Sequence, residues 1–101
     1  MQQIQAIIFK EYFFKKFNKL DIDIKNIFYS KLEILETKDY ISKPLHFKEH
    51  DIDLRSIRIG KLRFLFVLDD YKAIFLDVMY RELDYKPEYL KRLYKVYKYS
   101  N

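Results

Sequence analysis

Residues 54–81, LRSIRIGKLRFLFVLDDYKAIFLDVMYR, decide the fold of this chain. They hold its only glycine, and Gly60-Lys61 separates two runs of apolar, β-branched or aromatic residues. This pattern predicts a two-residue hairpin loop with glycine at the first central position, where φ must be positive. The register that follows pairs Arg58 with Arg63 across the hairpin. The other predicted pairs are Ile59 with Leu62, Ile57 with Phe64 and Ser56 with Leu65.

A third antiparallel strand is predicted over residues 72–80, after a three-residue loop at 69–71. Burial sets this loop length, because a register shift of one residue would turn every core side chain to the wrong face. The register places Asp77 opposite Arg63, so the open face is expected to carry the row Arg58, Arg63 and Asp77. The expected core face holds Ile57, Ile59, Leu62, Phe64, Phe66, Leu68, Ile74, Leu76 and Val78.

The segment before this sheet predicts a short strand and a helix hairpin. Residues 4–9 are a short apolar run, and from residue 10 to residue 20 the apolar period becomes that of a helix. A second helix is expected to begin near Asp21 or Asp23 as N-cap and to run to about residue 39. The apolar positions of the two helices are Phe13, Phe17 and Leu20, then Ile24, Ile27, Phe28, Leu32 and Leu35.

The end of the chain predicts a last helix that starts at Pro87, with Glu88 complementing its N-terminus. Its expected apolar stripe is Leu90, Leu93, Tyr94 and Tyr97. Its basic side carries Lys91, Arg92, Lys95 and Lys98 together with Tyr89 and Tyr99. The chain is therefore expected to be one α+β domain, residues 1–101, with element order β-α-α-β-β-β-α. The helix hairpin should pack on one face of a small antiparallel sheet.

The charge of the chain is positive and unevenly spread. The formal net charge is +5, yet residues 21–40 carry three lysines against five carboxylates. Residues 43–63 and 81–98 each carry six Lys or Arg against three carboxylates. Such local surplus suits nucleic acid or an acidic protein partner, although a solvated lysine face gives the same pattern.

Composition narrows the class of protein further. Cysteine is absent, which excludes disulfide scaffolds and Cys-ligated zinc and favours a reducing, cytoplasmic setting. The apolar runs are too short for a membrane span or a secretory signal. His46 and His50 stand four apart in a segment interrupted by Pro44, and no third histidine exists to complete a metal site. We expect no metal, no cofactor and no membrane contact.

Two opposed arginines on a sheet repel each other by up to about 1 kcal/mol, which calls for a compensating partner. Asp77 is one candidate, and a bound phosphate bridging both guanidinium groups is another. Four of the five arginines lie in residues 54–81. The predicted phosphate- or RNA-binding residues are Arg55, Arg58, Lys61, Lys48, Lys91, Arg92 and Lys95.

The stretch RIGKLRFLFVLDD followed by IFLDVMYRELDY resembles the RelE/ParE-type toxins of type II toxin–antitoxin systems. That family has a hairpin of the form R-V-G-x-Y-R-V-x-Y and a last strand ending H-R-R-x-x-Y. The resemblance implies a toxin neutralised by a cognate antitoxin. RelE-like members cut mRNA in the ribosomal A site, whereas ParE-like members poison DNA gyrase. By matching positions, the catalytic residues implied are Arg63, Arg81 and Tyr85.

The chemistry implied is attack of a ribose 2′-hydroxyl on the neighbouring phosphate, which needs a base, positive charge at the phosphorane and an acid. Arg63 and Arg81 would supply the charge. RelE has lysines on the strand before the hairpin, where this chain has Leu54 and Ser56. Lys48 or a loop histidine would then act as base. The alternative is a non-catalytic or gyrase-directed toxin.

Overall fold

The computed structural model describes residues 4–37, 52–80 and 86–100, and its elements follow the predicted β-α-α-β-β-β-α order. The predicted α+β class is thus confirmed. No helix among these residues is long and apolar enough to cross a membrane. The elements are β1 Ala6–Phe9, α1 Glu11–Phe17, α2 Ile22–Thr37, β2 Asp53–Ile59, β3 Leu62–Asp69, β4 Lys72–Tyr80 and α3 Pro87–Tyr99.

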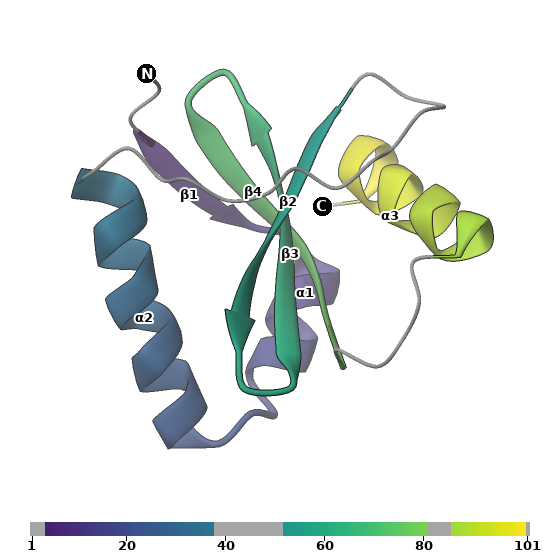
Figure 1. Ribbon diagram of the computed structural model, residues 1–101. Helices are drawn as coiled ribbons and strands as arrows, with labels where there is room; N and C mark the ends of the chain where they lie inside the picture. Colours follow the sequence, from purple (N-terminus) through teal and green to yellow (C-terminus); the bar gives the residue numbers. More distant parts are fainter. Residues whose placement is uncertain (1–3, 38–51, 81–85, 101) are drawn as a thin grey trace.

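The four strands form one sheet in the order β1-β4-β3-β2 (Figure 1). β2, β3 and β4 are antiparallel neighbours as predicted, but β1 pairs parallel with β4, from Ala6 beside Lys72 to Phe9 beside Phe75. The sheet is therefore mixed rather than wholly antiparallel. Because β1 ends at Phe9, the later half of β4 has no strand on that side.

The β2–β3 hairpin has the predicted turn and register. Gly60 has φ +57°, in the region where a side chain is strained, while Lys61 follows it at an ordinary φ. Arg58 lies opposite Arg63. The remaining pairs, Ile59 with Leu62, Ile57 with Phe64 and Ser56 with Leu65, also match the prediction.

The β3–β4 hairpin differs from the prediction in two ways. Its loop has two residues, Asp70 and Tyr71, whose φ values of 50° and 65° are those of a type I′ turn. A bulge at Leu76 then shifts the register, so that Asp77 lies opposite Leu65 and not opposite Arg63. A bulge adds an unpaired residue to one strand, which breaks the uninterrupted alternation assumed from the sequence.

One face of the sheet packs against α1 and α2 through an aromatic core. Phe28 is fully buried, and its ring centroid lies 4.7 Å from that of Phe64 and 5.1 Å from that of Phe17. The predicted placement of Ile57, Ile59, Phe64, Phe66 and Val78 on this face is confirmed. The buried members of the cluster are Ile4, Phe13, Phe17, Phe28, Leu32, Ile57, Ile59, Phe64, Phe66, Ala73, Phe75 and Val78.

The other face is covered by α3 and is not open. This second cluster contains Ile74 and Leu76, which were expected on the α1/α2 side. Because the β3–β4 turn is shorter than predicted, Phe75 lies on the α1/α2 side instead, and its neighbours Ile74 and Leu76 lie on the α3 side. Figure 1 shows the sheet between α2 and α3. The buried members of this cluster are Leu54, Leu65, Val67, Ile74, Leu76, Met79, Leu93 and Val96.

The helices differ from the predicted stripes where tertiary packing decides. α1 ends at Phe17, one turn earlier than expected, and the backbone carbonyl of Asp21 accepts from Lys25 at the start of α2. Ile27, expected in the stripe of α2, is 46% exposed. On α3 the buried residues are Leu93 and Val96.

α1 lies beside the part of β4 that β1 leaves unpaired, and it contributes to both cores. Phe13 and Phe17 enter the aromatic cluster, whereas Tyr12, one position earlier, packs against the cluster under α3. Residues four apart on a helix share a face, so Lys16 extends on the same side as Tyr12. This side of α1 faces α3 across the end of β4.

Candidate functional site

The predicted arginine pair stands on the α3 side of the β2–β3 hairpin. Arg58 is exposed and Arg63 is half-buried, and Met79 of β4 lies opposite Arg63 in the register. Asp77, which the sequence placed opposite Arg63, lies two residues before Met79 in β4, opposite Leu65. The cross-strand pair of cations is therefore confirmed, while the expected row of Arg58, Arg63 and Asp77 is wrong.

Two other predicted phosphate-binding residues of the hairpin lie apart from this pair. Arg55 shares the face of Phe66, its neighbour in the register, and its Nε donates to Asp53 Oδ1 at 2.9 Å. Lys61 is exposed in the turn itself. The structure thus groups Arg58 with Arg63 and places Arg55 on the opposite face.

The positions that match the family's strand lysines cannot supply a base. Leu54 is fully buried in the cluster under α3, and Ser56 is half-buried opposite Leu65. Several residues of the predicted site lie outside the described part of the chain: Arg81, Tyr85, Lys48, His46 and His50. Within that part, no group of three or more His, Cys, Asp or Glu could hold a metal ion.

The predicted basic side of α3 is exposed at Lys91, Arg92 and Lys95. Of these three, Arg92 alone lines the groove described below. Tyr89, expected on the basic side, is half-buried against the cluster under α3 and donates its hydroxyl to Asp77 Oδ2. Tyr89 therefore lies on the side of α3 that packs against the sheet, where Asp77 accepts the hydrogen bond from its hydroxyl group.

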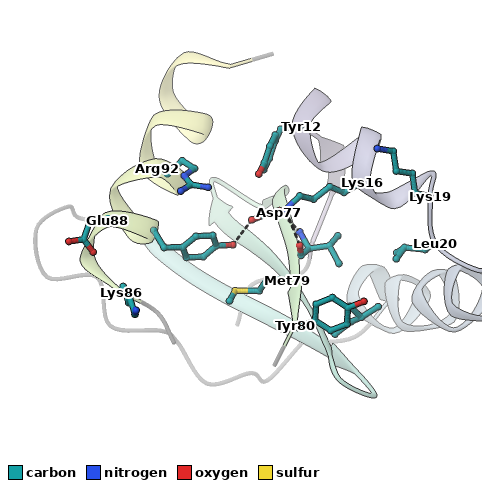
Figure 2. Close-up of a pocket in the computed structure, with 13 residues that line it drawn as sticks. Tyr12, Lys16, Lys19, Leu20, Asp77, Met79, Tyr80, Lys86, Glu88 and Arg92 are labelled. Atoms are coloured by element: carbon teal, nitrogen blue, oxygen red, sulfur yellow. Dashed lines mark hydrogen bonds and ion pairs between the residues drawn. The ribbon is translucent and has the colours of Figure 1, made fainter. Parts of the chain in front are cut away.

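A groove of about 730 Å³ lies between α1, the end of β4 and α3 (Figure 2). Tyr12 and Arg92 stand on opposite walls, and Asp77 and Met79 lie between them. Its size is typical of sites for small molecules and cofactors, roughly 300–1,000 Å³. The lining residues are Tyr12, Lys16, Lys19, Leu20, Leu62, Asp77, Val78, Met79, Tyr80, Lys86, Glu88, Tyr89 and Arg92.

The floor of the groove is fixed by Asp77, the one buried charged residue of the described chain, at 1% exposure. Its Oδ1 accepts from Lys16 Nζ at 2.7 Å and from the backbone N–H of Val78 at 2.8 Å, and its Oδ2 accepts from Tyr89. Lys16 Nζ also lies 3.3 Å from the Val78 carbonyl oxygen. Lys16 and Asp77 thus satisfy both backbone groups of Val78 on the side of β4 that no strand covers.

The electrostatics of this cluster keep Lys16 charged. Its partial burial opposes the cationic form, but the hydrogen bond and the negative charge of Asp77 outweigh that effect and raise the pKa of Lys16 above its ordinary value. The ammonium also lies 4.9 Å from the centre of the Tyr12 ring. Lys16 is accordingly a cation held in place rather than a proton acceptor.

The sequence pointed to the hairpin arginines but missed Lys16, Lys19, Tyr12 and Tyr80 as members of a groove. One signal was present: Asp77 interrupts the apolar run IFLDVMY, and a buried carboxylate needs partners. Which partners it takes depends on the bulge at Leu76 and on how α1 and α3 approach each other. Neither feature has a local sequence pattern.

No protein-family model and no curated protein sequence matches the chain. Several solved structures do share its fold. The isolated RelE toxin of E. coli superposes with a TM-score of 0.62 at 18% identity, covering 90% of this chain and 97% of that one. A free E. coli RelE variant with two arginines replaced by alanine gives 0.58 at 18% identity, covering 94% and 93%.

A third match is the toxin–antitoxin complex RelBE2 of Mycobacterium tuberculosis. It has a TM-score of 0.53 and 22% identity, and the match covers 80% of this chain and 94% of that one. These likenesses extend over nearly the full length of each matched chain. The chain therefore has the RelE fold, as the hairpin and last-strand pattern of its sequence predicts.

Proposed function

We propose that this chain is the toxin of a type II toxin–antitoxin module and acts as a ribosome-dependent endoribonuclease in the cytoplasm. The observation that carries the proposal is the RelE fold over 90% of the chain. The sequence resemblance further implies that Arg63, which lies opposite Arg58 on the hairpin, contacts phosphate. Two of the matched structures are a toxin and a toxin–antitoxin complex. A cognate antitoxin is the protein partner proposed here.

In the proposed reaction the ribose 2′-oxygen forms a bond to the adjacent phosphorus, and the bond from phosphorus to the 5′-oxygen of the next nucleotide breaks. The products are a 2′,3′-cyclic phosphate and a free 5′-hydroxyl. Arg63, with Arg58 beside it, stabilises the charge of the phosphorane, because a guanidinium group gives two parallel hydrogen bonds and stays protonated. Arg81 and Tyr85 complete the proposed site by their positions in the motif.

The base in this proposal comes from outside β2, since Leu54 is buried and Ser56 has no basic group. Lys48, His46 and His50 are the candidates that the sequence offers, because lysine and histidine are side-chain types that can act as general bases. The proton taken from the 2′-hydroxyl passes to this base. A proton returned to the leaving 5′-oxygen completes the balance of the step.

The experiment that tests this function is induced expression of the chain in bacteria, followed by mapping of mRNA 5′ ends. We expect cuts in phase with codons and arrest of growth. Arg63→Ala should slow cleavage about 10²–10³-fold, the usual cost of removing one group that stabilises transition-state charge. Lys72→Ala is the matched control, because Lys72 is exposed at the far end of β4.

A second candidate is a toxin that acts through binding alone, by poisoning DNA gyrase. The observation that favours it is that Leu54 is fully buried and that Ser56 carries no basic group, at the positions that the sequence resemblance matches to the RelE lysines. DNA damage without codon-phased cuts after induction would support this candidate and reject the ribonuclease. Rescue of growth by an acidic, partly disordered protein encoded next to the chain would support a toxin of either kind.

A further inference from the structure

The groove between α1 and α3 collects cations from three separate parts of the chain. Lys16 comes from α1, and Lys19 lies in the turn that follows this helix. Lys86 stands directly before α3, and Arg92 lies one and a half turns into α3. Their convergence is a property of the tertiary structure and not of one basic helix face. Of these four cations, Arg92 alone is among the binding residues predicted from the sequence.

The charge balance of the groove is positive toward an incoming ligand. Two carboxylates line it, and the buried one, Asp77, is already paired with Lys16 at 2.7 Å. Three further cations that line the groove are exposed, namely Lys19, Lys86 and Arg92. The other lining carboxylate is that of Glu88, which points away from the other lining side chains in Figure 2. The rim therefore attracts an anion.

Aromatic side chains lie between these cations. Tyr12 lines one wall, and Tyr80, at the end of β4, is 61% exposed. Met79 and Leu62 give the groove an apolar floor beside them. An exposed ring on an apolar floor with cations around it is the arrangement that binds bases by stacking and a backbone by charge.

We propose that this groove, the α1–α3 groove, binds single-stranded RNA directly, with bases against Tyr80 and Tyr12 and phosphates at Lys19 and Arg92. Neither Arg58 nor Arg63 lines the groove, whereas Met79, which lies opposite Arg63, does. RNA binding in the groove deepens the proposed function, on which the choice of RNA rests, and it gives the chain an affinity for RNA that needs no ribosome. Because the cations stand beside the exposed ring of Tyr80, RNA fits better than an acidic protein segment, which would leave this ring without a stacking partner.

The test measures binding of the purified full chain to a fluorescent oligoribonucleotide of about ten nucleotides by anisotropy, over roughly 50–200 mM salt. All riboses carry 2′-O-methyl groups, so that cleavage by 2′-hydroxyl attack is blocked and binding is measured alone. Lys19→Ala/Arg92→Ala removes two groove cations. Lys15→Ala/Lys72→Ala removes two exposed cations that do not line the groove, with the same change of net charge.

We expect the groove variant to bind about tenfold or more weakly, and its slope of log affinity against log salt to fall by about 1.4, since each single-strand phosphate contact contributes about 0.7. The control variant should stay within about twofold of the parent chain. Equal losses in both variants would show diffuse surface charge and overturn the proposal. The proposal would also be overturned if the parent chain binds no RNA and an acidic antitoxin occupies the groove.

A second pair of variants tests the stacking part of the site. Tyr80→Ala should weaken binding by about fivefold or more, the loss found when one base loses its stacking ring. Tyr71→Ala is the control, because Tyr71 is exposed in the turn at the other end of β4. No loss from Tyr80→Ala would contradict the placement of bases there. Because the probe cannot be cleaved, binding and cleavage are measured independently. RNA binding without codon-phased cuts in cells would reject the ribonuclease and support the groove. Codon-phased cuts without RNA binding would support the ribonuclease and reject the groove.

Discussion

The two faces of the sheet are stabilised by different means. On the α1/α2 face, the buried residues are all apolar and the rings of Phe9, Phe13, Phe17, Phe28, Phe64 and Phe75 contact one another. On the α3 face, the smaller apolar cluster is accompanied by a buried carboxylate and by hydrogen bonds from two tyrosines. The first face depends on packing, which is not directional, whereas the second depends on specific polar partners.

The polar face is also the one that carries the candidate sites. Arg63 and the α1–α3 groove both belong to it, and α3 is held at its two ends by Tyr89 on Asp77 and by Tyr97 on Asp69. Lys10 Nζ adds a bond of 2.8 Å to the Ser100 carbonyl oxygen beyond the helix. Asp77 and Asp69 each accept a hydrogen bond from a tyrosine of α3, so hydrogen bonds as well as apolar packing position this helix.

The largest expected effect is on the aromatic face. Phe28→Ala should lower the free energy of unfolding by about 3–5 kcal/mol, because the lost ring leaves a cavity among tightly packed neighbours. Equilibrium unfolding in urea measures this change. Phe14→Ala is the control, since Phe14 is 49% exposed on α1 and should change the value by no more than about 0.5 kcal/mol. A loss below about 1 kcal/mol for Phe28→Ala would show that this face is not packed as described.

On the polar face, Asp77→Asn should lower the free energy of unfolding by about 1–3 kcal/mol. The amide keeps the size of the side chain but removes the charge that Lys16 pairs with and one acceptor used by its partners. Glu11→Gln is the matched control, because it removes one carboxylate of the Glu11–Lys15 ion pair on α1, the helix that also carries Lys16. Both side chains of this pair are exposed, and such surface pairs contribute about 0–1 kcal/mol. Equal effects in urea unfolding would mean that the Asp77 cluster behaves as a surface ion pair.

This contrast between faces explains what the sequence was able to predict. Gly60 and the apolar runs beside it determined the β2–β3 register, since one turn type fits the pattern and every pair follows from it. The aromatic face was predicted correctly through Phe64 and Phe66, because alternation is unbroken along β3. The fold class and the element order followed from the same periodicities.

The polar face was predicted less well because it depends on local exceptions. Asp70 and Tyr71 adopt positive φ without glycine, so the two-residue turn carried no glycine signal. The bulge at Leu76 then moved Asp77 away from Arg63. Lys16 and Tyr89 were recognisable as site residues only once Asp77 was placed between α1 and α3. These are tertiary choices that residue spacing does not encode.

A smaller effect is expected from the tyrosine that joins α3 to Asp77. Tyr89→Phe should cost about 1–2 kcal/mol of unfolding free energy, because Asp77 keeps two of its three donors and loses one hydrogen bond to a charged acceptor. Hydrogen exchange of the α3 amides should become faster in this variant. Tyr99→Phe, at a residue 82% exposed, should change neither quantity. Unchanged exchange in Tyr89→Phe would show that packing alone holds the helix.

The smallest effect separates the two tyrosine contacts by pH. Burial and the hydrogen bond to Asp69 raise the pKa of Tyr97 to about 12 from its ordinary value of 10.0. The folded chain therefore keeps this proton where the unfolded chain has lost it, so the stabilisation is complete below about pH 10 and disappears as the pH rises through about 12. Lys16, whose pKa is also raised, changes stability in the same direction in every variant that retains it.

Tyr97→Phe isolates the contribution of this phenol, because it keeps the ring and removes only the hydroxyl group, while the other nine tyrosines and all lysines are present in both proteins. The difference in urea midpoint between the parent chain and Tyr97→Phe should be largest near pH 8 and should shrink as the pH rises above about 10. A difference that grows with pH would mean that the phenolate, rather than the phenol, is favoured beside Asp69. That result would require Asp69 to be turned away from Tyr97, and the C-terminal end of α3 would then be held by Lys10 and apolar contact alone.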